Sequence, residues 1–263
     1  SERHIELRNE TRRLSFLSFH GNGYKMNSNT VWIFGDSYAA LHEGHIDSSI
    51  LPENTQWGQI LGNKLDYNVI NLGVGGSPFE HSTKCFYDSL SSLKENDLIV
   101  VCLTSFTRKW IFEDNPTYSF LSMFKRMLME EKITKNDYDF YSRYFGEIHN
   151  HTIEKRHALN WVTSVAYHAN LKKVKCLIIP CFSSSRLDLT SLYNKNFYKV
   201  SGSLWDDVSL KEFTYESRLP ANTMDPRRNH MCPENHEILA DKIFTTVTSN
   251  SVLDLKSGFK TNL

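Results

Sequence analysis

The segment Asp97–Leu103 constrains the fold of this chain more than any other. It reads Asp-Leu-Ile-Val-Val-Cys-Leu, which is a nearly continuous apolar run. Strands with this pattern are covered on both faces, as are the central strands of a parallel sheet. The run therefore predicts a parallel sheet that has helices on both sides.

Strand-like and helix-like patterns alternate around this run. Further strands are predicted at Val31–Gly35, Asn68–Gly73 and Val174–Phe182. Helices are predicted at Gln56–Leu65, at Phe79–Leu93, over roughly Tyr118–Leu171 with a break near Thr134–Asp137, and at Pro233–Val247. This alternation within 263 residues predicts one domain, a three-layer α/β/α sandwich.

The amino-acid composition excludes several classes of binding partner. Lys and Arg together number 30, as do Asp and Glu, so no basic field attracts nucleic acid. No stretch is long enough to span a membrane, and the N-terminus lacks the apolar core of a secretory signal. The five cysteines form no CxxC pair and no His/Cys cluster of zinc-ligand spacing. We therefore expect a soluble protein, cytoplasmic or part of a larger soluble particle, with no metal, no organic cofactor, and neither nucleic acid nor membrane as partner.

The two ends of the chain differ from its middle. Residues 1–25 are polar and basic and precede Met26, so we interpret them as a leader or an artificial extension. The alternative is an arm that packs on the domain or on a partner. The domain is predicted at residues 26–250, followed by a C-terminal tail at residues 251–263.

Four polar segments stand where the predicted elements meet. They are Gly35-Asp36-Ser37 after the first strand, Asn71–Ser77 after the second, Leu103–Arg108 after the third, and His230–His236 at the start of the last helix. The carboxyl ends of parallel strands are where open α/β sheets bind ligands. A serine there has its hydroxyl in the crevice, although each segment taken alone could be an ordinary turn.

In this order, the four segments resemble those of the SGNH/GDSL hydrolase superfamily, over about Val31 to Val247. The resemblance implies a mainly parallel, flavodoxin-like central sheet. It also implies that Ser37 is the nucleophile and His230 the general base. The N–H groups of Ser37 and Gly76 would form the oxyanion hole, because a tetrahedral oxyanion needs fixed donors.

The third segment departs from the family pattern. Phe106 stands where the family has an asparagine that donates to the oxyanion. The hydroxyl of Ser105 or Thr107 could take over that role, because either can donate one hydrogen bond. Arg108 could bring positive charge to the site or lie on the surface.

The triad acid departs from the pattern as well. Arg227 occupies the position of the acid, three residues before His230, and Asp225 is the nearest carboxylate upstream. Asp225 could orient the imidazole; otherwise the enzyme is a Ser-His dyad. We expect Asp36 to hydrogen-bond within its own turn and His236 to serve packing.

The predicted function is hydrolysis of an ester through an acyl-enzyme on Ser37. An acetyl ester of a carbohydrate is the preferred substrate, because the aromatic-rich stretch Ser183–Thr223 could present a groove for sugar rings. A lipase or thioesterase of the same superfamily is the alternative enzyme. A degenerate, non-hydrolytic carbohydrate-binding or structural module is the alternative outside catalysis.

Overall fold

The computed structural model describes residues 28–40, 56–111, 121–182, 185–204, 231 and 233–260. The predicted leader, residues 1–25, lies outside the described residues. So does about half of the aromatic-rich stretch, chiefly the part from residue 205 onward.

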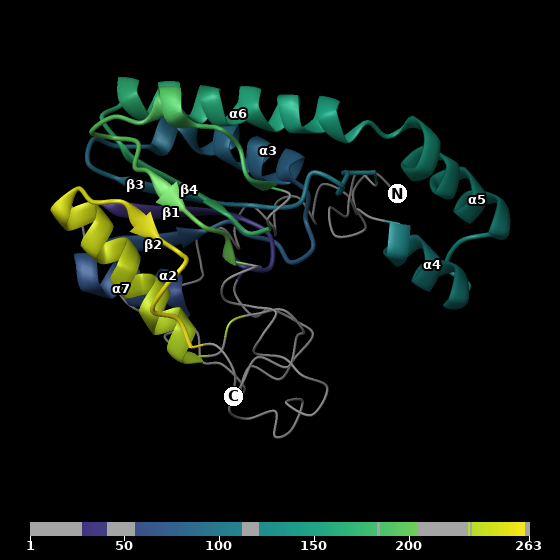
Figure 1. The fold of residues 1–263 in the computed structure, drawn as a ribbon, viewed down its shortest axis with the longest axis horizontal. Helices are drawn as coiled ribbons and strands as arrows, with labels where there is room; N and C mark the ends of the chain where they lie inside the picture. The colour runs from purple at the N-terminus through teal and green to yellow at the C-terminus, as the bar shows by residue number, and fades with distance from the viewer. Residues whose placement is uncertain are drawn as a thin grey trace, which may run out of the picture.

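A four-stranded sheet forms the centre of the fold (Figure 1). Its strands are β1 (Thr30–Gly35), β2 (Asn68–Asn71), β3 (Leu98–Leu103) and β4 (Lys175–Pro180). The order across the sheet is β2-β1-β3-β4, and each neighbouring pair is parallel. This is the strand order of flavodoxin-like folds, so the prediction of a parallel, flavodoxin-like sheet is confirmed.

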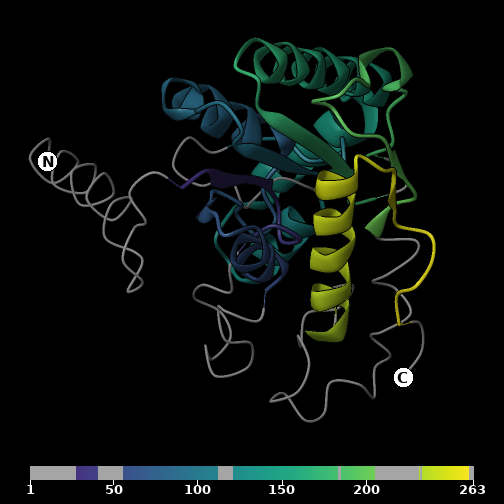
Figure 2. The ribbon, with the colours of Figure 1, turned by 90° about the vertical axis from the view of Figure 1, so that its left-hand side faces the viewer.

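Helices cover both faces of the sheet (Figures 1 and 2). One face carries α2 (Trp57–Leu65) and α7 (Pro233–Ser249). The opposite face carries α3 (Phe79–Ser89) and α6 (His151–Leu171). The predicted three-layer α/β/α sandwich is therefore confirmed.

Two apolar clusters, one on each side of the sheet, make the core. Alternate residues of β3 divide between them: Val100 belongs to the cluster with α2 and α7, and Val101 to the cluster with α3 and α6. Because both sets are buried, the strand shows no polar alternation in its sequence. Each large side chain buried in this way stabilises the fold by about 1.5–3 kcal/mol.

The long helical region predicted over residues 118–171 is divided into several pieces. They are α4 (Leu121–Met129), α5 (Lys135–Arg143), a π-helical turn η3 (Tyr144–Ile148) and α6. Thr134 begins α5 with a capping box that includes Asp137, which explains the break predicted there. The predicted role of covering the sheet belongs to α6, because α4 and α5 lie beyond the sheet in Figure 1.

Short elements complete the described part of the chain. They are the 3-10 turns η2 (Leu90–Ser92) and η5 (Thr190–Leu192) and the strands β5 (Val200–Ser201) and β6 (Leu253–Asp254), which pair in parallel. Leu253 and Leu255 are buried in the core, so this part of the predicted C-terminal tail packs on the domain. Among the described helices, none combines the length and the apolar character needed to cross a bilayer.

Candidate active site

The turn that carries Ser37 begins where β1 ends. The backbone carbonyl of Asp36 accepts hydrogen bonds from the N–H groups of Ala39 (3.0 Å) and Ala40 (2.8 Å), which closes one tight turn. The Asp36 carboxylate also accepts from the N–H of Tyr38 (3.1 Å), as expected for a residue that caps its own turn. Ser37 is partly exposed on this turn, whereas Asp36 and Tyr38 are buried. The turn therefore presents Ser37 at the carboxyl edge of the sheet.

Residues 71–77, the second segment, pack against this turn. The Gly35 carbonyl accepts from the N–H of Val74 (3.0 Å) and from the hydroxyl of Ser77 (3.2 Å). The side-chain amide of Asn71 donates to the Ala39 carbonyl (2.6 Å). A methyl group at Gly73 would lie 2.7 Å from the Ala39 Cβ and 2.8 Å from the Ala40 nitrogen. Only glycine allows this close approach of two backbones.

Gly75 and Gly76 are the last two glycines of the second segment. A methyl group added at Gly75 would lie 3.9 Å from the Cβ of Ser37. Gly76 has φ of 77°, in the left-handed region that favours glycine. The sequence resemblance assigned the oxyanion N–H to Gly76 and did not single out Gly75. The structure brings Gly75 next to Ser37, and the role of Gly76 stays a prediction.

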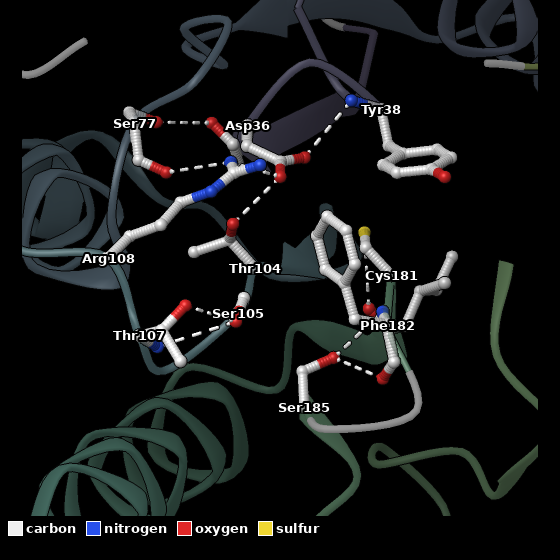
Figure 3. A network of polar contacts seen from close by, with 12 residues as sticks. Asp36, Tyr38, Ser77, Thr104, Ser105, Thr107, Arg108, Cys181, Phe182 and Ser185 are labelled. Carbon is white, nitrogen blue, oxygen red and sulfur yellow. Dashed lines mark hydrogen bonds and ion pairs between the residues drawn. The ribbon is translucent and has the colours of Figure 1, made fainter. Parts of the chain in front are cut away.

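The third segment, residues 103–108, reaches the same turn through side chains, and Lys109 follows it directly (Figure 3). The Thr104 hydroxyl and the Nη1 of Arg108 both donate to Oδ2 of Asp36, each at 2.7 Å. Asp36 is 0% exposed and the Arg108 side chain only 14%. Sequence reasoning left Arg108 between the site and the surface, and the structure places it at the site. The available signal in the sequence was the position of Arg108, a few residues after the end of a buried strand.

Arg108 also contacts two other parts of the site. Its Nη1 lies 3.5 Å from the Ser77 carbonyl oxygen. The guanidinium carbon lies 5.2 Å from the ring centroid of Phe182, and the ring of Phe182 packs edge-on against Tyr38. Arg108 therefore joins the ends of β1, β2 and β4.

Lys109 holds the third segment from the other side. Its ammonium donates to Glu80 of α3 (2.8 Å) and to Glu154 of α6. Burial works to lower the pKa of Lys109, but the hydrogen bonds to Glu154 and Glu80 outweigh it, so the pKa is raised. Two consecutive cations, Arg108 and Lys109, thus bind this part of the chain to the turn of Ser37 and to two helices.

The remaining residues predicted for the third segment divide between core and surface. Phe106 is fully buried, and its ring contacts those of Phe79 and His151. The asparagine position of the family therefore faces the core. The hydroxyls of Ser105 and Thr107 lie 2.9 Å apart and bond to each other (Figure 3). Their predicted roles as oxyanion donors remain predictions.

A buried thiol lies beside the network. Burial raises the pKa of Cys181, the neighbouring Cys102 thiol and Asp36 carboxylate raise it further, and Arg108 opposes them. Only a thiolate is an effective nucleophile. The raised pKa keeps the Cys181 thiol neutral.

His236 and Trp57 support the turn of Ser37 from the α2 and α7 side. The N–H of Trp57 donates to Nδ1 of the buried His236 (3.3 Å), and the indole N–H of Trp57 donates to the Tyr38 carbonyl (2.8 Å). His236 thus links α7 to the start of α2. These contacts agree with the packing role expected of His236.

The predicted base and acid, His230 and Asp225, lie outside the described residues, as does Arg227. Met231, which follows His230 directly, is buried in the apolar cluster that also contains Tyr38 and Ala39. This places the chain at residue 231 on the side of the sheet covered by α2 and α7. Within the described ranges, no group of three or more His, Cys, Asp or Glu side chains is placed to hold a metal ion.

No protein-family model matches the sequence, and no curated protein matches it. Several solved structures are similar to the chain. The psychrotrophic esterase EstA from a Pseudoalteromonas species is 13% identical with a TM-score of 0.42, and the match covers 84% of this chain and 97% of EstA. A member of the lipolytic G-D-S-L family from Veillonella parvula DSM 2008 is 9% identical with a TM-score of 0.33, covering 86% of this chain and 78% of that one.

A third similar structure is that of TesA. It is 15% identical with a TM-score of 0.32, and the match covers 57% of this chain and 59% of TesA. The match therefore spans little more than half of either protein. The strand order and the two helical layers confirm the three-layer α/β/α fold that the motif resemblance implied.

Proposed function

We propose that this protein is a serine ester hydrolase whose acyl-enzyme forms on Ser37. The observation that carries the proposal is the position of Ser37, partly exposed on a tight turn at the carboxyl end of β1, with Gly75 beside its Cβ. Ligands of open α/β sheets bind at this edge. Glycine leaves room for the carbonyl of a substrate to approach the backbone there.

The mechanism follows from the chemistry of a serine hydroxyl. Ser37 attacks the ester carbonyl while His230 accepts its proton, since the hydroxyl is a weak nucleophile without a base. The N–H groups of Ser37 and Gly76 stabilise the resulting oxyanion. His230 then gives the proton to the departing alcohol, and water releases the acid in a second cycle of the same steps. Asp225 would orient the imidazole in a triad, and a dyad would work without it.

A short acyl group, such as acetyl on a carbohydrate, is the substrate that we propose. The structure has a cavity of about 150 Å³ lined mostly by apolar residues, among them Leu103, Ile178 and Leu189, but Ser37 is not part of its lining. This cavity therefore does not serve as an acyl-chain tunnel for the nucleophile. The aromatic residues of the stretch 183–223 support a sugar as the alcohol.

The test is covalent labelling combined with a substrate panel. A fluorophosphonate should label Ser37, and Ser37→Ala should abolish both labelling and turnover of acetylated sugars and short p-nitrophenyl esters. Ser91→Ala, an exposed serine of η2, is the matched control and should leave both unchanged. Substantial turnover by folded Ser37→Ala protein would overturn the mechanism. Faster hydrolysis of long-chain esters or thioesters would favour a lipase or thioesterase.

The burial of Phe106 favours one competitor, the degenerate binding module, because the asparagine donor of the family is absent at that position. Such a module would bind carbohydrate without being labelled by the fluorophosphonate. Labelling at Ser37 excludes it.

A further inference from the structure

The inward-facing Phe106 leaves the oxyanion without the side-chain donor that the family pattern provides. Arg108 follows two residues later, and its side chain instead binds Asp36 in the turn of Ser37. Arginine carries five N–H donors and stays protonated in proteins. It therefore has the chemistry needed to stabilise a developing negative charge.

The guanidinium contacts a chain neighbour of each predicted backbone donor, Ser37 and Gly76. Its Nη1 contacts Asp36, the residue directly before Ser37, at 2.7 Å. The same nitrogen lies 3.5 Å from the carbonyl of Ser77, the residue directly after Gly76. The guanidinium thus spans the two chain segments whose N–H groups would bind the oxyanion (Figure 3).

The surroundings fix the orientation of this cation. The buried Asp36 carboxylate holds Nη1, and the ring of Phe182 lies against the guanidinium. Asp36 also accepts hydrogen bonds from Thr104 and Tyr38, so its negative charge is shared among three donors. A preorganised charge in a site largely shielded from water stabilises a transition state more strongly than a mobile one.

We propose that Arg108 is a catalytic residue that stabilises the tetrahedral oxyanion in place of the missing asparagine. The inference rests on the proposed esterase function. When Ser37 Oγ bonds to the carbonyl carbon, the π electron pair moves to the carbonyl oxygen, which becomes an anion beside the guanidinium. When the C=O bond forms again, the bond to the alcohol breaks and the alcohol takes its proton from His230. Arg108 keeps all its protons throughout.

A double-mutant cycle with Asp36 tests this role. Arg108→Gln alone leaves a buried carboxylate without its cation and could weaken the fold. The double variant Asp36→Asn/Arg108→Gln removes both charges, and the asparagine amide can still bond to Thr104. Each variant is checked by circular dichroism and melting temperature before kinetics with a short p-nitrophenyl ester. Arg156→Gln, an exposed arginine of α6, is the matched control.

We expect Arg108→Gln and the double variant to lose about 10²–10³-fold in kcat with KM within a few fold of wild type. Asp36→Asn should retain more activity than either, and guanidinium ions should partly restore the double variant. If the double variant is as active as Asp36→Asn, Arg108 is only a counter-ion and the inference is wrong. Wild-type kcat in Arg108→Gln would overturn it too. Wild-type protein that neither hydrolyses esters nor labels at Ser37 would instead overturn the proposed function, and the inference with it.

Discussion

The second and third segments contact the same turn, that of Ser37, by different means. Residues 71–77 approach it mainly through backbone hydrogen bonds and through glycines that allow close contact. Residues 103–108 approach it through a hydroxyl and an arginine that both bind Asp36, and the adjoining Lys109 binds two helices. The contacts of the second segment require glycines, which have no side chain. Those of the third segment require the ion pair between Arg108 and Asp36. The two should therefore respond to different kinds of mutation.

Removal of one partner of the ion pair between Arg108 and Asp36 should have the largest effect on stability. Removing one partner of a buried ion pair costs about 3–5 kcal/mol, because the other charge is left uncompensated. We expect Arg108→Gln to lower the free energy of unfolding by that amount, measured by urea denaturation. Asp36→Asn/Arg108→Gln should recover most of the loss. Equal stability of the single and double variants would show that the pair is not the link that holds the third segment.

Replacing a glycine by alanine should have the next largest effect on stability, but only where the second segment contacts the turn of Ser37. Gly73→Ala places a methyl group against the backbone of Ala39 and Ala40, and we expect a loss of about 1–3 kcal/mol in unfolding free energy. Gly75→Ala is the matched control, because the nearest atom to its methyl group, at Ser37, is 3.9 Å away. Its stability should change by less than about 0.5 kcal/mol. Similar losses in the two variants would contradict the close-approach argument.

The polar contact of the second segment should contribute less. Asn71 donates to the Ala39 carbonyl and accepts from the N–H of Gly73 (2.9 Å). Asn71→Ala should therefore cost about 1–1.5 kcal/mol, measured by urea denaturation. Asn63→Ala, on the exposed side of α2, serves as the reference and should change stability less. A loss as large as that of Arg108→Gln would remove the distinction between the two segments.

The smallest expected effect is the change of stability with pH that the titration of Lys109 causes. The folded-state pKa of Lys109 is raised above its ordinary value of 10.5, so its stabilising contribution is complete below that value. The contribution is lost as pH rises through the folded pKa. Melting temperatures between about pH 9.5 and 11.5 should fall more steeply for wild type than for Lys109→Met. Parallel curves would show that Lys109 does not titrate with the fold.

Much of the fold could be predicted because burial on both faces leaves a direct mark in the sequence. The run at residues 97–103 contains β3 in full, and β1, β2 and β4 lie within the predicted ranges or one residue outside them, whereas the short strands β5 and β6 were not predicted. The separation of α4 and α5 from the sheet could not be predicted, since their apolar positions resemble those of a helix that covers a core. What decides their place is tertiary packing, which a periodic pattern does not specify.

The positions of residues at the candidate site could be predicted where they follow strand ends, but not where they depend on a long-range ion pair. Ser37 and the glycines after β2 follow strand ends in recognisable patterns. Arg108 and Asp36 are 72 positions apart, and no periodicity links an ion pair at that separation. The pairing depends on the β1–β3 register, which brings Gly35 opposite Cys102 and so sets the two following segments side by side.

The strand order β2-β1-β3-β4 also determines when the site can form during folding. The turn of Ser37 is completed only after β1 has paired in parallel with both β2 and β3, each of which comes much later in the chain. Such non-local pairings form slowly, because the intervening chain must be closed into a loop before any contact stabilises it. A newly made chain therefore carries the Ser37 segment from early on, but the segments that pack against this turn join it only after the non-local strand pairs have formed.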